Sequence, residues 1–149
     1  MVRYAFYPSP FGMLQIGHED GNVVSVSCAK DACNHDPSPV SDLANAQLQE
    51  YFLGTRRSFD LPIRLTGTPF QLSVWKALQE IPYGETRSYG QIAAAIGKPG
   101  AARAVGMACN RNPLWIIIPC HRVVGSNQSL TGYAGGLNMK RALLTIEQK

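Results

Sequence analysis

The residues with the clearest chemical potential are a cysteine and its two basic neighbours. Cys120, His121 and Arg122 follow one another directly after Pro119. A nearby base and positive charge favour the thiolate, which is the nucleophilic form of cysteine. Neighbouring side chains of a strand point to opposite faces, so cooperation of Cys120 with His121 needs a turn at Pro119 or a bridging water. A buried, inert core cysteine is the competing interpretation.

Three further cysteines, Cys28, Cys33 and Cys109, are spread along the chain. The first two lie near His18 and His35, but Cys-x4-Cys-x-His is not a standard zinc spacing. Because no secretory signal is recognisable, free thiols are the favoured interpretation. A small-loop disulfide and a metal site remain alternatives for this pair, and we expect no metal at the nucleophilic cysteine.

The charges of the chain are distributed unevenly. Residues 86–146 contain no acidic residue, although the whole chain has ten. The same stretch contains seven basic residues, namely Arg87, Lys98, Arg103, Arg111, Arg122, Lys140 and Arg141. This pattern is expected of a surface that meets a polyanion such as DNA. An ordinary solvated basic face is the alternative.

The elements around the nucleophilic cysteine are well marked by capping signals. Residues 68–71, Thr-Pro-Phe-Gln, predict the start of a helix that ends near Glu80. Residues 88–91, Ser-Tyr-Gly-Gln, predict a second start for a helix to about Ile96. A four-residue turn with two glycines and a further helix over residues 101–109 follow. This arrangement is typical of a helix-turn-helix.

The second helix of this pair is unusual because its side chains are small. Arg103 is its only long polar side chain, among Ala102, Ala104, Gly106 and other small residues. Such a helix can approach DNA closely, or it can pack tightly against a neighbouring helix. After it, residues 114–118 predict a buried extended segment that Pro119 breaks. Residues 137–147 predict a closing helix.

The N-terminal half predicts a sheet and one helix. Apolar runs at residues 2–7, 13–17 and 23–28, separated by turn residues, indicate an antiparallel meander. A polar loop over residues 34–39 precedes a helix over residues 42–53 that Ser41 could cap and Gly54 could end. We therefore expect an α/β (α+β) protein with a structural sheet domain over residues 1–66. A mainly helical, winged helix-turn-helix domain over residues 67–149 would carry DNA binding and chemistry.

Some functional classes have no signal in the chain. No stretch approaches the roughly 20 apolar residues of a membrane helix. The sequence also lacks a phosphate-binding loop or dinucleotide fingerprint of the expected form. We expect a cytoplasmic protein with no membrane association and no cofactor.

The segment Pro119-Cys120-His121-Arg122-Val123 resembles the active-site signature of the O6-alkylguanine-DNA alkyltransferases, also called methylated-DNA--protein-cysteine methyltransferases. Further segments resemble the same family in order and spacing over residues 67–147. They are residues 67–71 with Val74-Trp75, residues 81–84, 88–93 and 101–106, Asn112-Pro113, Gly132-Tyr133 and Gly135-Gly136. The N-terminal half is similar only as a sheet-containing cap of suitable length.

The resemblance implies a partner and a mode of binding. A family member binds duplex DNA with the helix-turn-helix in the minor groove and flips the alkylated base out of the stack. Arg103 matches the arginine that replaces the base, and Ala102, Ala104 and Gly106 let the helix approach the groove floor. Ser88 is assigned to the DNA-binding set with them. We expect a monomer, and cooperative binding by several copies is left open.

The resemblance also assigns residues to the chemistry. Cys120 would take the alkyl group, with His121 activating it through a water and Glu147 orienting the imidazole. Glu147 lies near the end of the chain, where helices often fray. Tyr89 would assist base flipping and protonation of the leaving guanine. Lys140 matches a residue near the cysteine and base.

A hinge and a base pocket complete the implied site. Asn112 matches the hinge between the helix-turn-helix and the active-site loop, and Val123 matches a residue whose backbone contacts the base. Tyr133, Ala134 and Gly135 would line the base pocket. Some members carry serine where Ala134 stands, so O4-alkylthymine or larger alkyl groups are additional candidate lesions.

The resemblance implies a single-use reaction, because the thioether that forms on Cys120 is stable. Three other functions compete with it. A non-catalytic alkylated-DNA-binding protein of the same superfamily would lack the cysteine. A winged-helix regulator would need base-reading side chains that the Ala-rich helix does not supply. A Cys-His hydrolase would turn over repeatedly.

Overall fold

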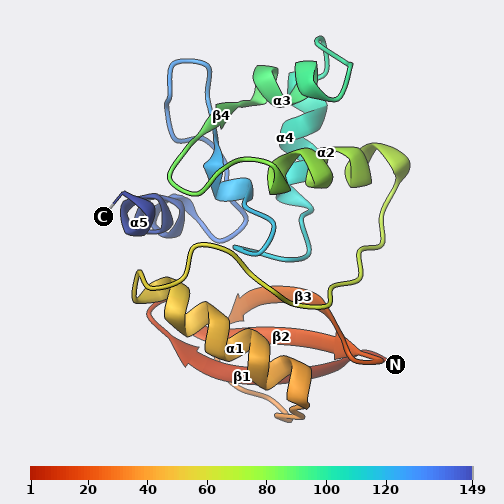
Figure 1. Ribbon diagram of the computed structural model, residues 1–149, viewed down its shortest axis with the longest axis vertical. Helices are drawn as coiled ribbons and strands as arrows, with labels where there is room; N and C mark the ends of the chain where they lie inside the picture. The colour runs from red at the N-terminus through yellow and green to blue at the C-terminus, as the bar shows by residue number, and fades with distance from the viewer. Residues whose placement is uncertain (149) are drawn as a thin grey trace. The chain divides into compact units, whose positions relative to one another are not determined.

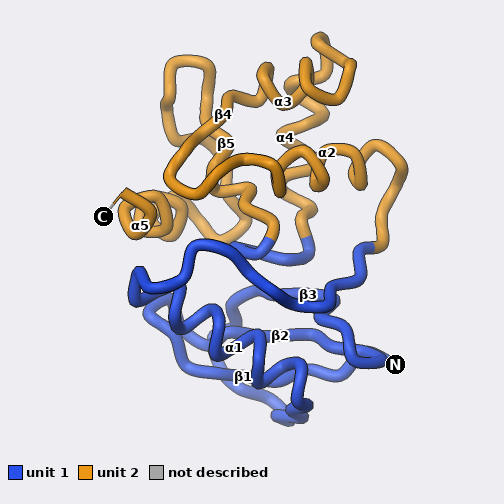
Figure 2. Tube along the Cα trace, viewed as in Figure 1, with its two compact units in different colours: residues 1–65, 113–117 blue, residues 66–112, 118–149 orange. Residues whose placement is uncertain are grey.

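The computed structural model describes residues 1–148 and divides the chain into two compact units (Figures 1 and 2). Unit 1 contains residues 1–65 and 113–117, and unit 2 contains residues 66–112 and those from 118 onward. A single boundary near residue 66 therefore misplaces residues 113–117. This segment joins unit 1 because Val26 N–H donates to Pro113 O at 2.8 Å and Trp115 N–H donates to Val26 O at 3.1 Å.

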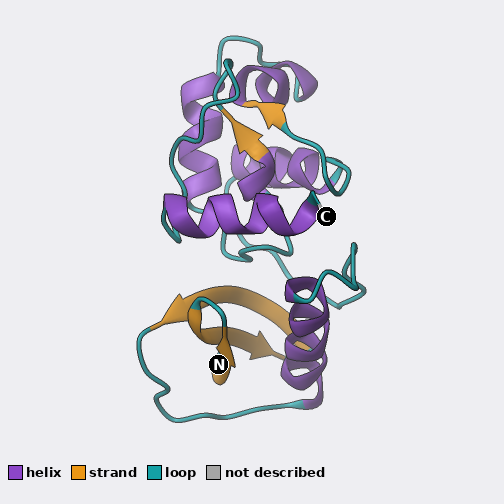
Figure 3. Cartoon of the chain, turned by 90° about the vertical axis from the view of Figure 1, so that its left-hand side faces the viewer, coloured by secondary structure: helices purple, strands orange, loops and turns teal. Residues whose placement is uncertain are grey.

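Unit 1 is a three-stranded antiparallel sheet with one helix, as the sequence predicts (Figure 3). Strands β1 (Arg3–Ser9), β2 (Gly12–Glu19) and β3 (Asn22–Ala29) pair in chain order. Helix α1 (Pro39–Phe52) packs against the sheet. Leu14, Ile16, Val26 and Leu48 are fully buried between these elements, so the core of this unit is apolar.

Helix α1 begins earlier than its sequence indicates. Ser38 is the N-cap and its hydroxyl accepts a hydrogen bond from the N–H of Ser41, while the N–H of Ser38 donates to the hydroxyl oxygen of Ser41. Pro39 occupies the first helical turn, where its missing N–H costs nothing. The expected cap, Ser41, is therefore the third residue of the helix, and Ser38 has the capping role.

Unit 2 contains four α-helices in its described part. They are α2 (Pro69–Gln79), α3 (Tyr89–Ala95), α4 (Ala102–Asn110) and α5 (Leu137–Glu147). Helices α3 and α4 pack together across the turn that Gly97 allows with a φ of +78°. Thr68 and Ser88 cap α2 and α3 with the predicted capping boxes. The helix-turn-helix is therefore confirmed.

Three short elements of unit 2 were not expected. A 3-10 turn, η1 (Cys120–Arg122), leads into strand β5 (Val123–Val124). Strand β5 pairs in parallel with β4 (Arg87–Ser88), which directly precedes α3. This pairing ties the segment after Cys120 to the start of the helix-turn-helix. A loop over residues 125–136 then leads to α5.

Among residues 1–148, no helix is both long and apolar enough to cross a membrane.

Candidate functional site

Cys120 is the first residue of η1 and is 4% exposed. Pro119 adopts φ −81° and ψ 64°, and Cys120 N–H donates to Ile118 O at 2.8 Å. The chain therefore turns at Pro119 instead of continuing as a strand. Because of this turn, Cys120 and the two basic residues after it are all buried in the interior of unit 2.

Asn112 holds the loop that carries the cysteine. Its Nδ2 donates to Ile118 O at 2.8 Å and to the Sγ of Cys120 at 3.3 Å. Its backbone N–H donates to Cys109 O at 3.2 Å, at the end of α4. One buried amide thus connects the second helix of the helix-turn-helix with the cysteine, and the role of Asn112 as a hinge stays a prediction.

The Cys120 thiol is protonated in the free protein. Burial raises its pKa to about 11, although the Asn112 hydrogen bond and the charge of Lys140 lower it. Desolvation of the buried sulfur outweighs both of these effects, so the basic residues that follow Cys120 in sequence do not keep the thiol ionised. A base must therefore take the proton when the thiol reacts.

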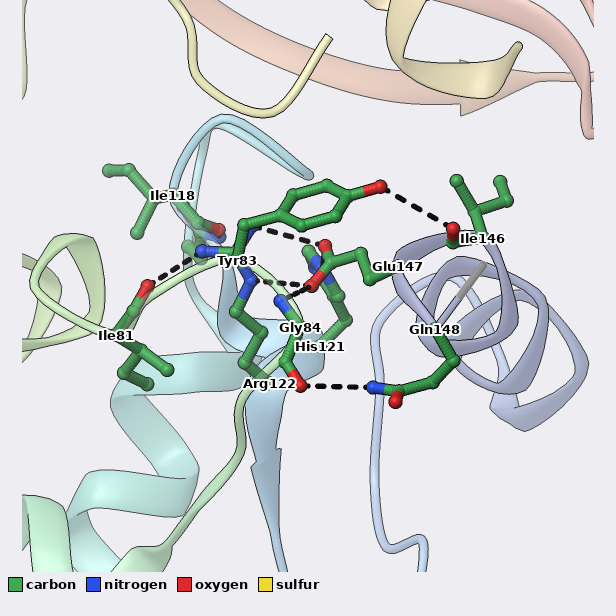
Figure 4. Close-up of polar contacts among 10 residues, drawn as sticks. Ile81, Tyr83, Gly84, Ile118, His121, Arg122, Ile146, Glu147 and Gln148 are labelled. Carbon is green, nitrogen blue, oxygen red and sulfur yellow. Dashed lines mark hydrogen bonds and ion pairs between the residues drawn. The ribbon is translucent and has the colours of Figure 1, made fainter. Parts of the chain in front are cut away.

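His121 can serve as that base. The ring is fully buried, and Nε2 lies 2.6 Å from Oε2 of Glu147 (Figure 4). Burial lowers the pKa of His121, and the Glu147 carboxylate opposes this effect. The imidazole is therefore neutral at neutral pH and can accept a proton, and the carboxylate would stabilise the imidazolium that forms.

Glu147 is held by several donors besides His121. Arg122 donates from Nε to Oε1 at 2.8 Å and from Nη2 to Oε2 at 3.1 Å, which is a bidentate ion pair. The N–H of Gly84 donates to Oε1 at 3.1 Å. A third nitrogen of Arg122, Nη1, donates to Ile81 O at 2.7 Å. This network is drawn in Figure 4.

Sequence reasoning missed the roles of Arg122 and Gly84. A signal for Arg122 existed, because a buried acid in a stretch that is otherwise free of acids needs a cationic partner. Gly84 belongs to the family-like segment over residues 81–84, but its role stayed hidden because it acts through its backbone on a residue 63 positions away.

Lys140 fastens the loop that follows β5. It is fully buried, and Nζ donates to Val123 O at 2.5 Å, Thr131 O at 2.7 Å and Gly132 O at 3.3 Å. Burial lowers its pKa, and the nearby thiols of Cys120 and Cys109 oppose this effect. The ammonium group thus joins the strand before the loop to the middle of the loop.

Tyr89, the first residue of α3, contacts the same loop. Its hydroxyl donates to Thr131 O at 3.1 Å, and its ring lies 5.9 Å from the Lys140 ammonium. Burial raises the pKa of Tyr89, so its hydroxyl remains a proton donor. A Cβ at Gly106 would lie 3.7 Å from the Tyr89 ring, so α4 approaches the tyrosine closely.

The expected DNA-binding residues occupy the helix-turn-helix. Arg103 and Ala104 are exposed on α4, and Ala102 is half-buried. The hydroxyl of Ser88 caps the start of α3, because it accepts a hydrogen bond from Gln91 N–H at 3.0 Å. The structure therefore shows a capping role for Ser88, and its contact with DNA stays a prediction.

The remaining pocket residues lie on the loop over residues 125–136. Tyr133 and Gly135 are half-buried, and Ala134 between them is exposed. The N–H of Gly136 donates to Tyr133 O at 2.9 Å, which makes a turn around Ala134. Val123 is buried at the other end of the loop, where its carbonyl accepts from Lys140.

The histidines near Cys28 and Cys33 have other partners. His18 Nε2 donates to Asp36 O at 2.7 Å, and His35 Nδ1 accepts from Phe6 N–H at 2.9 Å. Both cysteines are free thiols. Within residues 1–148, no group of three His, Cys, Asp or Glu side chains is arranged to hold a metal ion.

Two family models match the chain. The one described as 6-O-methylguanine DNA methyltransferase, DNA binding domain, matches residues 69–149. The one described as 6-O-methylguanine DNA methyltransferase, ribonuclease-like domain, matches residues 2–65. Together they span nearly the whole chain.

Individual relatives match along their full length. The methylated-DNA--protein-cysteine methyltransferase of Methanosarcina acetivorans is 50% identical over 98% of both chains. The constitutive methylated-DNA--protein-cysteine methyltransferase of Bacillus subtilis is 46% identical, over 99% of this chain and 96% of its own. A crystal structure of Mycobacterium tuberculosis OGT in complex with DNA is 48% identical, with a TM-score of 0.90, over 97% of this chain and 92% of its own.

Proposed function

The chain belongs to the 6-O-methylguanine DNA methyltransferase family, and we propose that it repairs DNA by accepting the alkyl group on Cys120. The family membership makes it a methylated-DNA--protein-cysteine methyltransferase that binds DNA. The observation that carries the residue assignment is the buried Cys120 held by Asn112, followed in sequence by a histidine paired with Glu147. This arrangement supplies a nucleophile, a base and an orienting carboxylate.

The transfer is a displacement at the alkyl carbon. A water carries the Cys120 proton to His121, and the sulfur attacks the alkyl carbon attached to O6 of guanine. The sulfur–carbon bond forms as the carbon–oxygen bond breaks, and the electron pair leaves with the guanine. Glu147 remains anionic and stabilises the imidazolium. The products are an S-alkylcysteine and, after proton uptake, an unmodified guanine.

The leaving guanine needs a proton donor, because its departing electron pair makes it an anion. Tyr89 suits this role, since its hydroxyl is protonated and half-buried beside the loop at Thr131. Lys140 acts differently from a catalytic residue. By binding Val123 O and Thr131 O, it keeps the base-pocket loop with Tyr133, Ala134 and Gly135 in place.

Helix α4 is the element that brings the alkylated base to Cys120. Arg103 is exposed on a helix whose neighbours Ala102, Ala104 and Gly106 are small, so the helix can lie in the minor groove. Arg103 would fill the space that the flipped nucleotide leaves in the stack. Ser88, at the cap of α3, would lie beside the DNA backbone. The protein would act on duplex DNA as a monomer.

The reaction consumes the protein, because water, even with His121 as its base, cannot displace the cysteine thiolate from the alkyl carbon of a stable thioether. Each molecule therefore acts once. O6-alkylguanine is the proposed lesion, and O4-alkylthymine is the second candidate because Ala134 offers no hydroxyl to discriminate between the two bases.

Replacing the nucleophile separates chemistry from binding. We expect Cys120→Ala to form no alkylated protein with an O6-methylguanine duplex while its dissociation constant for the duplex stays within about threefold of the wild-type value. The measurements are gel-shift binding and transfer of a radiolabelled methyl group. Cys33→Ala is the matched control, because Cys33 is exposed in the other unit, and it should transfer normally. Transfer by Cys120→Ala would refute the assignment.

A further inference from the structure

The turn before β4 holds the last turn of α5 (Figure 4). Gly84 N–H donates to Oε1 of Glu147 at 3.1 Å, and the side chain of Gln148 donates to Gly84 O at 3.0 Å. The hydroxyl of Tyr83 lies 3.4 Å from Ile146 O. Three consecutive residues at the end of α5 are therefore bound by two residues of one turn.

The turn fits Glu147 only with glycine at its tip. Gly84 has a φ of +83°, which side chains rarely adopt. A Cβ at this position would also lie 3.3 Å from the backbone oxygen of Glu147, closer than most Cβ contacts. A larger residue would thus be strained and would push the end of α5 away.

The end of a helix needs such support. Glu147 is the last residue of α5, so the helix provides no further turn to fix its side chain. Oε1 accepts from Gly84 N–H and from Arg122 Nε, whereas Oε2 faces Nε2 of His121 and also accepts from Arg122 Nη2. Gly84 thereby fixes the carboxylate on the side opposite the imidazole.

We propose that the Tyr83-Gly84 turn positions Glu147 for catalysis, so that Gly84 and Tyr83 are positioning residues for the His121 base. The inference rests on the proposed alkyl transfer to Cys120. The hydrogen bonds of the turn go to the end of α5, and the Tyr83 ring lies 5.6 Å from the guanidinium of Arg122, which also binds Glu147. Loss of the turn should therefore reduce the chemical step and leave DNA binding unchanged.

The test uses Gly84→Ala in a single-turnover assay across pH. The charged groups that act on His121 are Glu147, Arg122 and Lys140, and only Glu147 raises its basicity. With Glu147 displaced, His121 becomes a weaker base, and the thiol must ionise with less help. We expect the maximal transfer rate to fall about tenfold at neutral pH, a part of the about 10²- to 10⁴-fold that general bases contribute.

Two features of the data separate positioning from general damage. The deficit should shrink as the pH approaches the pKa of Cys120, about 11, because hydroxide then replaces the base. The half-saturating concentration of DNA should not change, and the free base O6-benzylguanine should react more slowly by the same factor as the duplex. Gly54→Ala is the matched control, since Gly54 has a φ of +79°, lies in the other unit and has open space around it.

A second variant avoids the backbone strain. Tyr83→Phe combined with Gln148→Ala removes both side-chain bonds between the turn and α5, and we expect a smaller, about threefold deficit with the same pH dependence. A deficit that is equal at all pH values, or one shared by Gly54→Ala, would overturn the inference while wild-type transfer still supports the proposed function. Absence of transfer by the wild-type protein would overturn both.

Discussion

At the scale of single residues, burial decides the chemistry of the site. Cys120 and His121 are both kept neutral in the free protein, because desolvation disfavours thiolate and imidazolium alike. The nucleophile is therefore unreactive until a substrate and a water complete the path to the base. A protein that can react only once benefits from such a protected thiol.

The buried thiols make the protein less stable as the pH rises into the alkaline range. Burial raises the pKa of Cys120 to about 11 and that of Cys109 to about 12, above the ordinary value of 9.0. Above about pH 9 the unfolded chain releases these protons and the native state keeps them, so the free energy of unfolding falls as pH rises. We expect Cys109→Ala to lose less stability than the wild type between about pH 8 and about pH 10.

Urea unfolding at both pH values measures this difference. Comparing the change with pH within each variant removes the cost of the cavity that the alanine leaves. Cys33→Ala, which alters an exposed thiol, should behave as the wild type does. An identical loss in Cys109→Ala would show that the Cys109 thiol ionises as easily in the native state as in the unfolded one.

Single residues also mark the limit of prediction from sequence. Family resemblance selected His121 and Glu147, and the structure brings them within 2.6 Å. Arg122 was recognised only as a neighbouring charge, because its pairing with a residue 25 positions away depends on where α5 packs. Gly84 lies in the family-like segment over residues 81–84, but a backbone N–H is common to almost every residue type, so the segment did not reveal the hydrogen bond to Glu147.

At the scale of elements, the sequence predicted correctly those features that hydrogen bonds between near neighbours determine. The capping boxes at Thr68 and Ser88 fixed the starts of α2 and α3. Helix α1 was placed late because Ser41 and Ser38 are both good caps, and the Pro at position 39 favours the earlier one. The pairing of β4 with β5 joins residues 36 positions apart in sequence, Arg87 with Val123 and Ser88 with Val124, which no periodicity reveals.

Helix α4 should matter for duplex DNA more than for free base. Arg103→Ala removes the side chain proposed to hold the stack open, so base flipping loses a few kcal/mol of compensation. We expect the transfer rate on duplex to fall roughly 10- to 100-fold, while the rate with free O6-benzylguanine stays within about twofold. Single-turnover assays on both substrates measure the two rates.

The loss of one positive charge in Arg103→Ala needs a matched control. Arg141→Ala removes an exposed arginine on α5 without touching α4. It should slow neither reaction by more than a small factor. Equal slowing of duplex and free-base reactions by Arg103→Ala would contradict a role in base delivery.

At the scale of the whole molecule, the acid-free stretch has two uses. Arg122 and Lys140 are buried in the site, where they hold Glu147 and the pocket loop. Four other basic residues of the stretch are exposed in unit 2, namely Lys98, Arg103, Arg111 and Arg141. Part of the charge pattern that suggested DNA binding therefore consists of buried residues that hold the site together.

Three of these exposed charges, Lys98, Arg103 and Arg111, lie on α4 or directly beside it and set the salt dependence of DNA binding. If they neutralise about three phosphates, the affinity for duplex should fall about 40-fold between about 50 and about 200 mM salt. Fluorescence anisotropy with an unmodified duplex measures this slope. Lys98→Ala should make the slope shallower by about one unit if its ammonium contacts a phosphate. An unchanged slope would remove Lys98 from the DNA-binding surface.

The extent of unit 1 could be predicted only in part, because it depends on contacts between residues far apart in sequence. The expected boundary after residue 66 lies next to Leu65, where the first segment of unit 1 ends. The inclusion of residues 113–117 in unit 1 depends on backbone hydrogen bonds to Val26, almost 90 positions earlier, so it required the structure.

The central claim is that Cys120 takes the alkyl group once and keeps it. Intact mass spectrometry after mixing the protein with an excess of an O6-methylguanine duplex tests it most directly. The account predicts one added methyl group per molecule, located on Cys120 by peptide mapping, and no repaired DNA beyond one equivalent of protein. An unmodified protein, a methyl group on another residue, or repair of several equivalents would contradict it.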